Sequence, residues 1–318
     1  LPALPEFNTD NPEVRAFIFD VARYWLDRGI DGWRLDVPTC IDDDAFWQEF
    51  REVVKDANPE AYIVGEISSL ATRWLQGDQF DGVMNYPLTR ACLSFFGGER
   101  MDTRLLSAPL FEGVRPMDAS AFARRVETLL EIYPREAALV QLNLLDSHDM
   151  PRFLTVVQGD EAALRLAFVF QMTYPGAPSI YYGDEIGMEG GPDPDCRRSF
   201  PWDESRWNGD LRAFVKRCVE VRKAHPALRR GDFVPLYAEN DVLVALRRLQ
   251  EERLIVAFNN GTATRHLDVP VSDHLPDGAH LRGLIGDGDS RVVSGRLRGP
   301  TLAPRTAAVL ALEAGSLA

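Results

Sequence analysis

In roughly the first 230 residues, apolar side chains follow two patterns that alternate along the chain. Some stretches repeat apolar residues at steps of three and four, which is typical of a helix with one buried face. Others are short unbroken apolar runs, which are typical of buried strands. The first predicted helix begins after Asn11, has Pro12 in its first turn and ends near Gly29. Its predicted apolar face comprises Val14, Phe17, Ile18, Val21, Ala22, Trp25 and Leu26.

The same alternation continues to about residue 224. Short apolar runs predict strands at residues 32–37, 61–66, 82–86, 138–145 and 178–182. Helical spacing predicts the intervening helices, among them one starting at residues 42–44 and closed by 58–59, one from Asp118 through Leu130, one spanning 164–171, and one at 211–223. Buried strands that alternate with amphipathic helices predict a parallel sheet of βα units, either open or closed into a barrel.

After residues 225–226 the pattern changes to short strands separated by turn formers. The predicted strands are residues 242–246, 253–258, 266–271 and 306–312, with Asn-Asn-Gly at 259–261 as one of the turns. We therefore predict a domain boundary near Arg230. Residues 1–230 form the α/β domain, and residues 231–318 form a small all-β sandwich.

Composition narrows the functional classes. The 318 residues include 35 basic and 48 acidic side chains, for a net charge of −13, so the chain has no basic surplus with which to bind nucleic acid. No apolar run approaches the roughly 18 residues that span a membrane. Four scattered cysteines without C-x-x-C spacing fit a reducing compartment, so we expect a cytoplasmic protein.

Candidate chemistry gathers where the predicted strands end. Arg34 and Asp36 share one face at the end of the first strand, Glu66 ends the second, and residues 146–149, Asp-Ser-His-Asp, end the fourth. Each residue alone is typical of a helix cap, a turn or a structural ion pair. The carboxyl ends of parallel strands meet at one edge of a sheet. Together these residues predict a converging acidic pocket.

Such a pocket can hold a divalent metal ion, or it can cleave a glycosidic bond with a nucleophile and a general acid. A metal site would require more clustered ligands, and the acidic run at residues 42–44 is typical of an exposed helix start. Glycoside hydrolysis needs one ionised and one protonated carboxyl group. We expect Arg34 to lower the pKa of Asp36 and the apolar neighbours of Glu66 to raise its pKa, which favours this chemistry.

These motifs resemble the alpha-amylase family of glycoside hydrolases, family thirteen. Residues 31–36 (DGWRLD) resemble the segment with the nucleophile, 64–66 (VGE) the segment with the general acid, and 147–149 (SHD) the segment with the third carboxylate. Residues 4–8 (LPEFN) are similar to a segment that precedes the fourth barrel strand, and 181–185 (YYGDE) continue the family order.

Within the family, the chain is most similar to the cyclomaltodextrinase, neopullulanase and maltogenic amylase group. Residues 84–87 (MNYP) and 190–197 (GGPDPDCR) match segments of that group. The resemblance implies that Tyr86, Asp193 and Arg197 contact sugar on the non-reducing side of the scissile bond.

The implied mechanism is retaining. Asp36 attacks the anomeric carbon, and Glu66 protonates the leaving oxygen and later activates water, with the two carboxyl groups about 5–5.5 Å apart. The resemblance implies that Asp149, with His148, holds sugar hydroxyls in the transition state. Arg34 orients Asp36 and keeps it ionised.

The implied substrates contain α-1,4 and also α-1,6 glucosidic bonds, as in maltodextrins, cyclodextrins or pullulan. Ser68 stands where members of the group usually carry Trp, which weakens the expectation for cyclodextrins. The chemistry requires no cofactor, although family members often carry a structural calcium ion. The resemblance leaves open whether the protein forms a homodimer. The alternatives are a 4-alpha-glucanotransferase-type transglycosylase and a non-catalytic amylase-like binding protein. Retention of all three carboxylates argues against the binding protein.

The resemblance also implies a fold. The chain is expected to supply strands four to eight of a TIM (β/α)8 barrel, followed by the β-sandwich. His148 is the first histidine, so the family's first motif, an Asp followed by Asn-His, is absent from the sequence. A barrel without its first three strands leaves unpaired edges. We therefore expect this polypeptide alone to be poorly folded and inactive.

Overall fold

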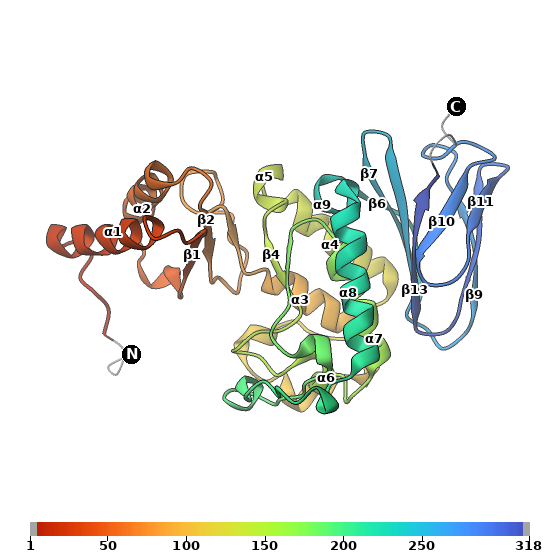
Figure 1. Cartoon of the computed structure of the whole chain (residues 1–318), viewed down its shortest axis with the longest axis horizontal. Coiled ribbons are helices and arrows are strands. Elements are labelled where there is room, and N and C mark those ends of the chain that lie inside the picture. The colour runs from red at the N-terminus through yellow and green to blue at the C-terminus, as the bar shows by residue number, and fades with distance from the viewer. Residues whose placement is uncertain (1–4, 314–318) are drawn as a thin grey trace. The chain divides into compact units, whose positions relative to one another are not determined.

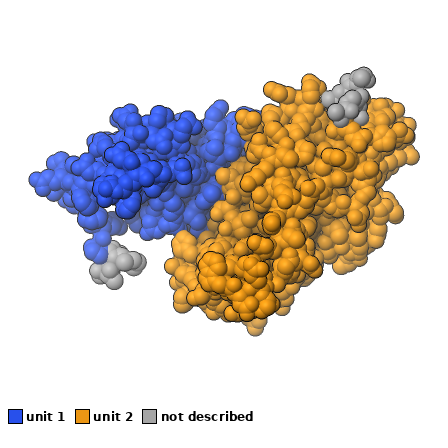
Figure 2. All heavy atoms as spheres, viewed as in Figure 1, with its two compact units in different colours: residues 1–87, 130–142 blue, residues 88–129, 143–318 orange. Residues whose placement is uncertain are grey.

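The computed structural model describes residues 5–313. Contacts within the chain divide it into two compact units (Figures 1 and 2): unit 1 comprises residues 1–87 and 130–142, and unit 2 comprises residues 88–129 and 143–318. The domain boundary expected near residue 230 falls inside unit 2 and stays a prediction. Leu4, the first residue of the predicted LPEFN segment, lies outside the described residues.

The core of unit 1 is a small parallel sheet. Its strands are β1 (Gly32–Leu35), β2 (Tyr62–Gly65) and β3 (Gly82–Val83), in that order. Arg34 on β1 is in register with Val64 on β2. These strands confirm the parallel βα arrangement that the alternating pattern predicts.

Two further strands form a separate short sheet. Met84 forms a parallel bridge with Leu142, the first residue of β4 (Leu142–Leu144). In turn, β4 pairs with β5 (Ala177–Ser179). All five predicted strands of the first 230 residues therefore exist, although each is shorter than predicted.

Helix α1 (Pro12–Leu26) begins as expected, because the Asn11 side chain accepts a hydrogen bond from the backbone N–H of Glu13. Its predicted apolar face is partly wrong, since Phe17 is 59% and Trp25 47% exposed. The buried stripe comprises Phe19, Ala22 and Leu26. The buried stripe includes Phe19, which the prediction left out, and lies at one edge of the predicted face, where α1 packs against α2.

Helix α2 (Asp44–Ala57) follows the prediction closely. The Asp43 carboxylate caps it by accepting from the Phe46 N–H at 3.2 Å. The predicted inward residues Phe46, Trp47, Phe50 and Val54 are all buried. The rings of Phe46 on α2 and Phe19 on α1 lie 5.4 Å apart, so the two helices share one aromatic core.

Asp81 links α2 to the sheet just before β3. Its carboxylate accepts from Arg51 Nη1 at 2.8 Å, from Lys55 Nζ at 2.9 Å and from the Ile63 N–H at 2.8 Å. Burial opposes ionisation of Asp81. The hydrogen bonds from Lys55, Ile63 and Arg51 outweigh that effect, so the pKa of Asp81 lies below its usual value.

Two predicted strand boundaries are wrong. The strand predicted at residues 82–86 ends earlier, because Tyr86 begins helix α3 (Tyr86–Cys92), whose second residue is Pro87. The strand predicted at 138–145 starts only at Leu142, since the residues before it form helix α5 (Arg135–Ala138). An apolar run alone does not distinguish a buried strand from a buried helical turn.

The remaining helices pack in unit 2, apart from the C-terminal end of α4. They are α4 (Ala119–Glu131), α6 (Phe153–Val156), α7 (Glu161–Thr173), α8 (Gly209–Ala224), α9 (Pro226–Arg230) and a π-helical turn, η2 (Leu93–Gly97). Short 3₁₀ turns are η1 (Pro38–Cys40), η3 (Gly98–Arg100), η4 (Thr103–Leu105), η5 (Pro109–Phe111), η6 (Asp184–Ile186), η7 (Asp195–Arg197) and η8 (Glu204–Arg206). No helix within residues 5–313 has the length and apolar character needed to cross a lipid bilayer.

An eight-stranded antiparallel sheet forms the C-terminal part of unit 2. In spatial order its strands are β6 (Asp232–Glu239), β7 (Val242–Leu249), β8 (Glu252–Asn259), β13 (Thr306–Leu312), β10 (His280–Ile285), β11 (Ser290–Val293), β12 (Arg296–Leu302) and β9 (Arg265–Pro270). The four predicted strands are confirmed as β7, β8, β9 and β13. The other four were missed, because β10 and β12 contain Gly283 and Gly299, β11 has only four residues, and β6 contains Pro235.

Arg247 on β7 ties this sheet to the helices of unit 2. Its side chain is fully buried. Nε donates to the carbonyl oxygen of Asp232 at 3.0 Å, Nη1 to that of Leu228 at 3.1 Å and Nη2 to that of Gly231 at 2.9 Å. Nη1 also contacts the carbonyl oxygen of Thr173, at the end of α7. One side chain thus supplies donors to the ends of two helices and to the start of β6.

Candidate active site

Two of the predicted carboxylates follow neighbouring strands in unit 1. Asp36 comes directly after β1 and Glu66 directly after β2. The backbone N–H of Glu66 donates to the carbonyl oxygen of Leu35 at 3.0 Å, which extends the strand pairing to the point where both side chains leave the sheet. The register of the two strands therefore fixes where these carboxylates start.

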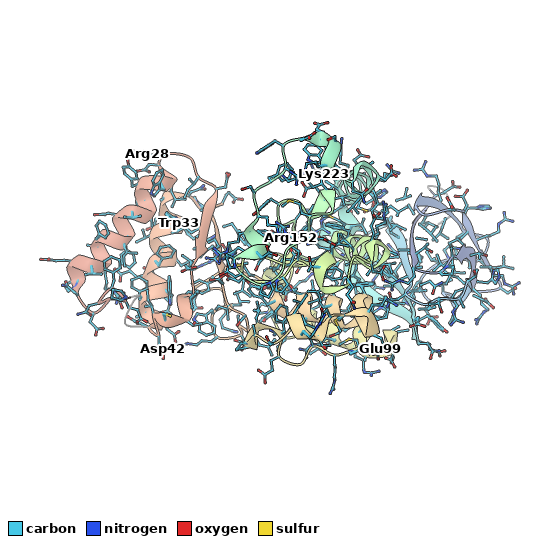
Figure 3. All side chains as sticks on the ribbon, turned by 90° about the horizontal axis from the view of Figure 1, so that it is seen from below. Arg28, Trp33, Asp42, Glu99, Arg152 and Lys223 are labelled. Carbon is cyan, nitrogen blue, oxygen red and sulfur yellow. The ribbon has the colours of Figure 1, made fainter. Side chains whose placement is uncertain are left out.

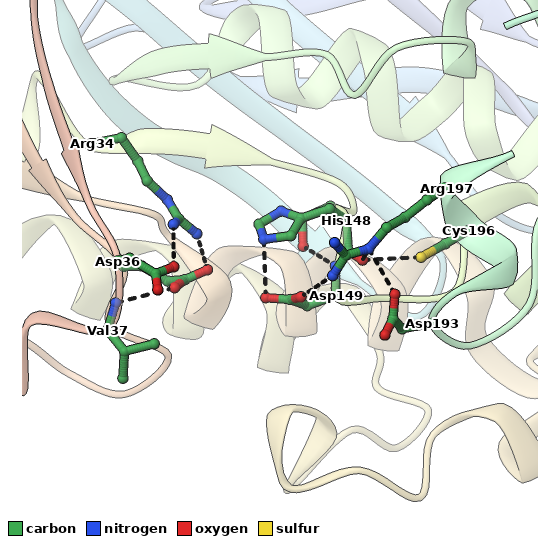
Figure 4. A network of polar contacts seen from close by, with 10 residues as sticks. Arg34, Asp36, Val37, His148, Asp149, Asp193, Cys196 and Arg197 are labelled. Atoms are coloured by element: carbon green, nitrogen blue, oxygen red, sulfur yellow. Dashed lines mark hydrogen bonds and ion pairs between the residues drawn. The ribbon is translucent and has the colours of Figure 1, made fainter. Parts of the chain in front are cut away.

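Arg34 joins the two carboxylates (Figure 4). Its Nη1 lies 2.6 Å from Asp36 Oδ1, and its Nη2 pairs with Glu66 Oε1. The second oxygen of Glu66 accepts from the Val37 N–H at 3.3 Å. The sequence predicted the pair with Asp36, and the structure adds Glu66 to the same guanidinium. Because the guanidinium is one planar fork, the two carboxyl groups lie side by side.

The two carboxylates differ in exposure. The Asp36 side chain is 82% exposed, whereas that of Glu66 is only 9% exposed. Val37, the residue after Asp36, has a φ of 35°, which turns the chain sharply just beyond the carboxylate. An open carboxylate beside a largely desolvated one gives the two groups different environments, as a nucleophile and a general acid require.

Tyr86, the other predicted site residue of unit 1, begins α3. Its side chain is 2% exposed, so the ring is a core element of the structure. Its expected contact with sugar stays a prediction.

The remaining predicted site residues lie in unit 2. Asp149 follows β4, and its N–H donates to Ser147 Oγ at 3.2 Å. Its carboxylate lies 3.3 Å from His148 Nε2 and 3.0 Å from Arg197 Nη2 (Figure 4). A histidine and an arginine thus orient the two oxygens of Asp149 separately.

Arg197 also organises the loop at residues 190–197. Its Nε lies 2.6 Å from Asp193 Oδ1 and donates to the carbonyl oxygen of His148 at 2.9 Å. The Cys196 thiol contacts the same carbonyl at 3.1 Å, so this cysteine is part of the loop packing. Gly190 is required here, because a Cβ at this position would lie 2.7 Å from the carbonyl oxygen of Asp195. Of the predicted residues in unit 2, all four belong to this one polar network.

Sequence reasoning missed a set of buried charges behind Asp149. Arg152, three residues later, is fully buried and pairs with Asp184 at 2.7 Å. The one signal in the sequence was a charged residue on each side of the SHD segment, which is no stronger than any surface charge pattern.

Comparisons with known proteins agree with the motifs. Residues 1–230 match the family described as "Alpha amylase, catalytic domain", and residues 231–299 match "Alpha-amylase C-terminal domain". A cyclomaltodextrinase from a Bacillus species is 44% identical over 265 residues, covering 82% of this chain and 44% of the relative. Neopullulanase 2 from Thermoactinomyces vulgaris is 45% identical over 267 residues, covering 82% of this chain and 42% of the relative.

Among solved structures, Ttha1563 from Thermus thermophilus superposes with a TM-score of 0.93 at 43% identity, covering 97% of this chain and 64% of that one. These matches confirm the predicted fold class, a barrel-type catalytic domain followed by an all-β domain. The chain spans about half the length of the curated relatives that it matches.

Proposed function

Because the chain belongs to the alpha-amylase family of glycosidases, we propose that the full-length protein hydrolyses α-1,4-glucosidic bonds in maltodextrins and related glucans with retention of configuration, whereas the inactivity of this polypeptide alone stays a prediction. The observation that carries this proposal is the pairing of Asp36 and Glu66 with one guanidinium, that of Arg34. Two carboxyl groups that share one guanidinium fit a retaining glycosidase, in which they lie about 5–5.5 Å apart, whereas inverting enzymes leave room for a water molecule between them.

In the proposed first step, Asp36 attacks the anomeric carbon and forms a glycosyl ester, while Glu66 donates its proton to the leaving glycosidic oxygen. In the second step, Glu66 accepts a proton from water, and the resulting hydroxide displaces Asp36 from the sugar. The largely exposed carboxylate thus acts as the nucleophile. The largely buried carboxyl group transfers the proton.

Arg34 fixes both groups before substrate arrives. Its contact with Glu66 must loosen when the glycosidic oxygen approaches, because an acid that donates to the substrate cannot keep its negative charge against a guanidinium. Its contact with Asp36 can persist, since the nucleophile attacks as a carboxylate anion.

In unit 2, we assign to Asp149 and His148 the binding of sugar hydroxyls. Arg197 positions Asp149 through the 3.0 Å ion pair and holds Asp193 at 2.6 Å, which supports a polar sugar-binding role for this loop. The resemblance adds Tyr86 to the sugar contacts. The steps use carboxyl groups of the chain and require no cofactor. A structural calcium ion stays a prediction, tested by activity after chelation.

The names of the relatives support cyclodextrins, pullulan and maltodextrins as the substrates to compare, with α-1,6 bonds included through pullulan. We also propose a cytoplasmic location, which the four free cysteines support. Sedimentation velocity tests the homodimer that the resemblance leaves open.

The test measures hydrolysis of maltodextrin, β-cyclodextrin and pullulan by the full-length protein and by its Glu66→Gln variant. Glu60→Gln, an exposed glutamate just before β2, is the matched control. We expect Glu66→Gln to lose most of the rate, at least about 10²-fold, and the control to keep it. Equal rates in all three proteins, or no activity in any, would overturn the proposal. Labelled acceptor sugars identify a transglycosylase, which makes products longer than its substrate.

A further inference from the structure

Three charged side chains of unit 2 are buried behind the segment that carries His148 and Asp149. Asp146 is 2%, Arg152 0% and Asp184 4% exposed. We name these three residues the buried triad. Figure 3 draws the side chains of the chain and labels Arg152 among them. No step of the proposed mechanism uses these residues, so their burial needs a separate explanation.

The contacts within the triad define where hydrogens must lie. Arg152 Nη1 is 2.7 Å from Asp184 Oδ1 and donates to the Tyr182 carbonyl oxygen at 2.8 Å. Asp146 Oδ2 accepts from the Phe153 N–H at 2.6 Å. The carboxyl groups of Asp146 and Asp184 are close enough to act on each other electrostatically. Two ionised carboxylates repel each other, which favours a proton on one of them.

Charge balance leads to the same conclusion. Arg152 contributes one positive charge, and the two carboxyl groups contribute two negative charges unless one is protonated. The triad is neutral with one shared proton and carries a net negative charge without it. An uncompensated charge in such a buried place is strongly unfavourable.

The surroundings add neutral groups. The Arg152 guanidinium lies over the rings of Tyr181 and Tyr182, at 4.4 and 4.9 Å from their centres. Burial raises the pKa of Tyr181 and that of the Cys196 thiol from the neighbouring loop, so both stay uncharged near neutral pH. Among described residues, the charged groups that act on the two carboxyls are therefore those of the triad itself.

Burial acts on both carboxyl groups of the triad. Burial raises the pKa of Asp184 well above its usual value, and the neighbouring Asp146 raises it further, although Arg152 opposes both effects. Burial raises the pKa of Asp146 as well, although the Phe153 N–H favours its charged form. We therefore place the proton on Asp184, whose Oδ1 accepts from Arg152.

We propose that Asp146 and Asp184 share one proton at neutral pH, and that the buried triad is a positioning device for the loop that carries His148 and Asp149. Asp146 and Arg152 stand immediately before and after residues 147–151, so the triad clamps both ends of that loop. The Arg152 N–H also donates to the Gly190 carbonyl oxygen at 2.9 Å, which ties the clamp to the loop bearing Arg197. The positioning part rests on the proposed glycosidase function, whereas the shared proton does not.

The first experiment detects the proton without any activity. Carbon-13 NMR of aspartate carboxyl groups in the full-length protein should show one neutral carboxyl at pH 7, and Asp184→Asn should remove that signal. Asp195→Asn, which alters an exposed ion-paired carboxylate, is the control and should leave the signal in place. Absence of any neutral carboxyl signal at pH 7 overturns the shared proton.

The second experiment tests positioning. Asp184→Asn keeps a neutral hydrogen-bond donor beside Asp146, so we expect kcat/KM on maltodextrin within about threefold of wild type and a weaker loss of activity at alkaline pH. Asp184→Ala removes the clamp, and we expect about 10²-fold loss of kcat/KM with a near-normal circular dichroism spectrum. Full activity in Asp184→Ala overturns the positioning role.

The outcomes separate the two proposals. If wild type cleaves no glucan, the proposed function fails, and the NMR result still decides the shared proton. The pH dependence of melting gives a further check. Wild type should lose stability relative to Asp184→Asn as pH rises from about 4 towards the raised pKa, because folding must hold a proton that the unfolded chain releases. Parallel melting curves against pH for the two proteins contradict the inference.

Discussion

Arg247 provides a quantitative test of how the C-terminal sheet is attached to the helices of unit 2. The change is Arg247→Met, which keeps the length and the apolar part of the side chain but removes all its donors. The guanidinium supplies hydrogen bonds to the carbonyl oxygens of Asp232, Leu228, Gly231 and Thr173. The variant therefore withdraws donors from helix ends that the fold buries.

The expected cost follows from those contacts. Arg222 Nη1 also donates to the Leu228 carbonyl at 2.9 Å, so that group keeps a partner. Each other carbonyl that loses its donor costs about 1–3 kcal/mol, and removing a buried guanidinium recovers part of that cost. We expect a net loss of about 3 kcal/mol in the free energy of unfolding. This equals a Tm lower by about 5–10 °C.

The assay is thermal unfolding of the full-length protein by circular dichroism, with Arg248→Met as the matched control. Arg248 is the next residue on β7, and its side chain, 43% exposed, forms a surface ion pair with Asp232 at 3.1 Å. Such a pair contributes about 0–1 kcal/mol, so the control should melt within about 2 °C of wild type. Equal shifts in the two variants, or an unchanged Tm in Arg247→Met, would refute the reasoning.

Three further predictions concern unit 1. Arg34→Ala should lower kcat/KM by about 10²-fold or more, because both carboxylates lose the group that holds them, and steady-state kinetics that match wild type would contradict this. Asp81→Asn should destabilise the protein most near neutral pH. The fold stabilises ionised Asp81, so wild type should have the larger free energy of unfolding in urea at pH values above the unfolded pKa. This difference should shrink as pH falls below about 4. A difference that stays constant at all pH values would contradict the prediction. Gly65→Ala should displace Glu66 and reduce kcat, because the new Cβ would lie 2.9 Å from the Phe80 ring. Gly77→Ala is the control for a glycine replacement without a steric clash, because open space surrounds Gly77, and it should leave kcat unchanged.

The strand-end carboxylates could be predicted because chain direction decides their location. Asp36 and Glu66 follow successive apolar runs of one parallel sheet, and such ends share an edge whatever the details of packing. The second partner of Arg34 could not be predicted in the same way. It depends on the register that sets Arg34 opposite Val64, and register comes from the whole sheet.

Helix faces and strand lengths were harder to predict, for a related reason. Phe17 and Trp25 fit a helical period as well as Phe19 does, and only the neighbouring helix α2 decides which stripe is buried. The strands β10 and β12 contain glycine and β11 is short, so each resembles a loop in isolation. They form strands because each pairs with two neighbours in the sheet.

Buried charges are the least predictable part of the site. Arg152 has the sequence context of a surface residue, yet it is fully buried, because Asp184 and the Tyr182 carbonyl satisfy it from a segment about thirty residues away. Spacing along the chain carries no information about such a partner.

The anomeric form of the first product is the decisive measurement. Proton NMR of maltodextrin hydrolysis, recorded before mutarotation, should show the α-anomer appearing first, because two inversions at one carbon, through Asp36 and then through water activated by Glu66, restore the configuration. Accumulation of the β-anomer first would mean a single displacement by water and would contradict the retaining mechanism.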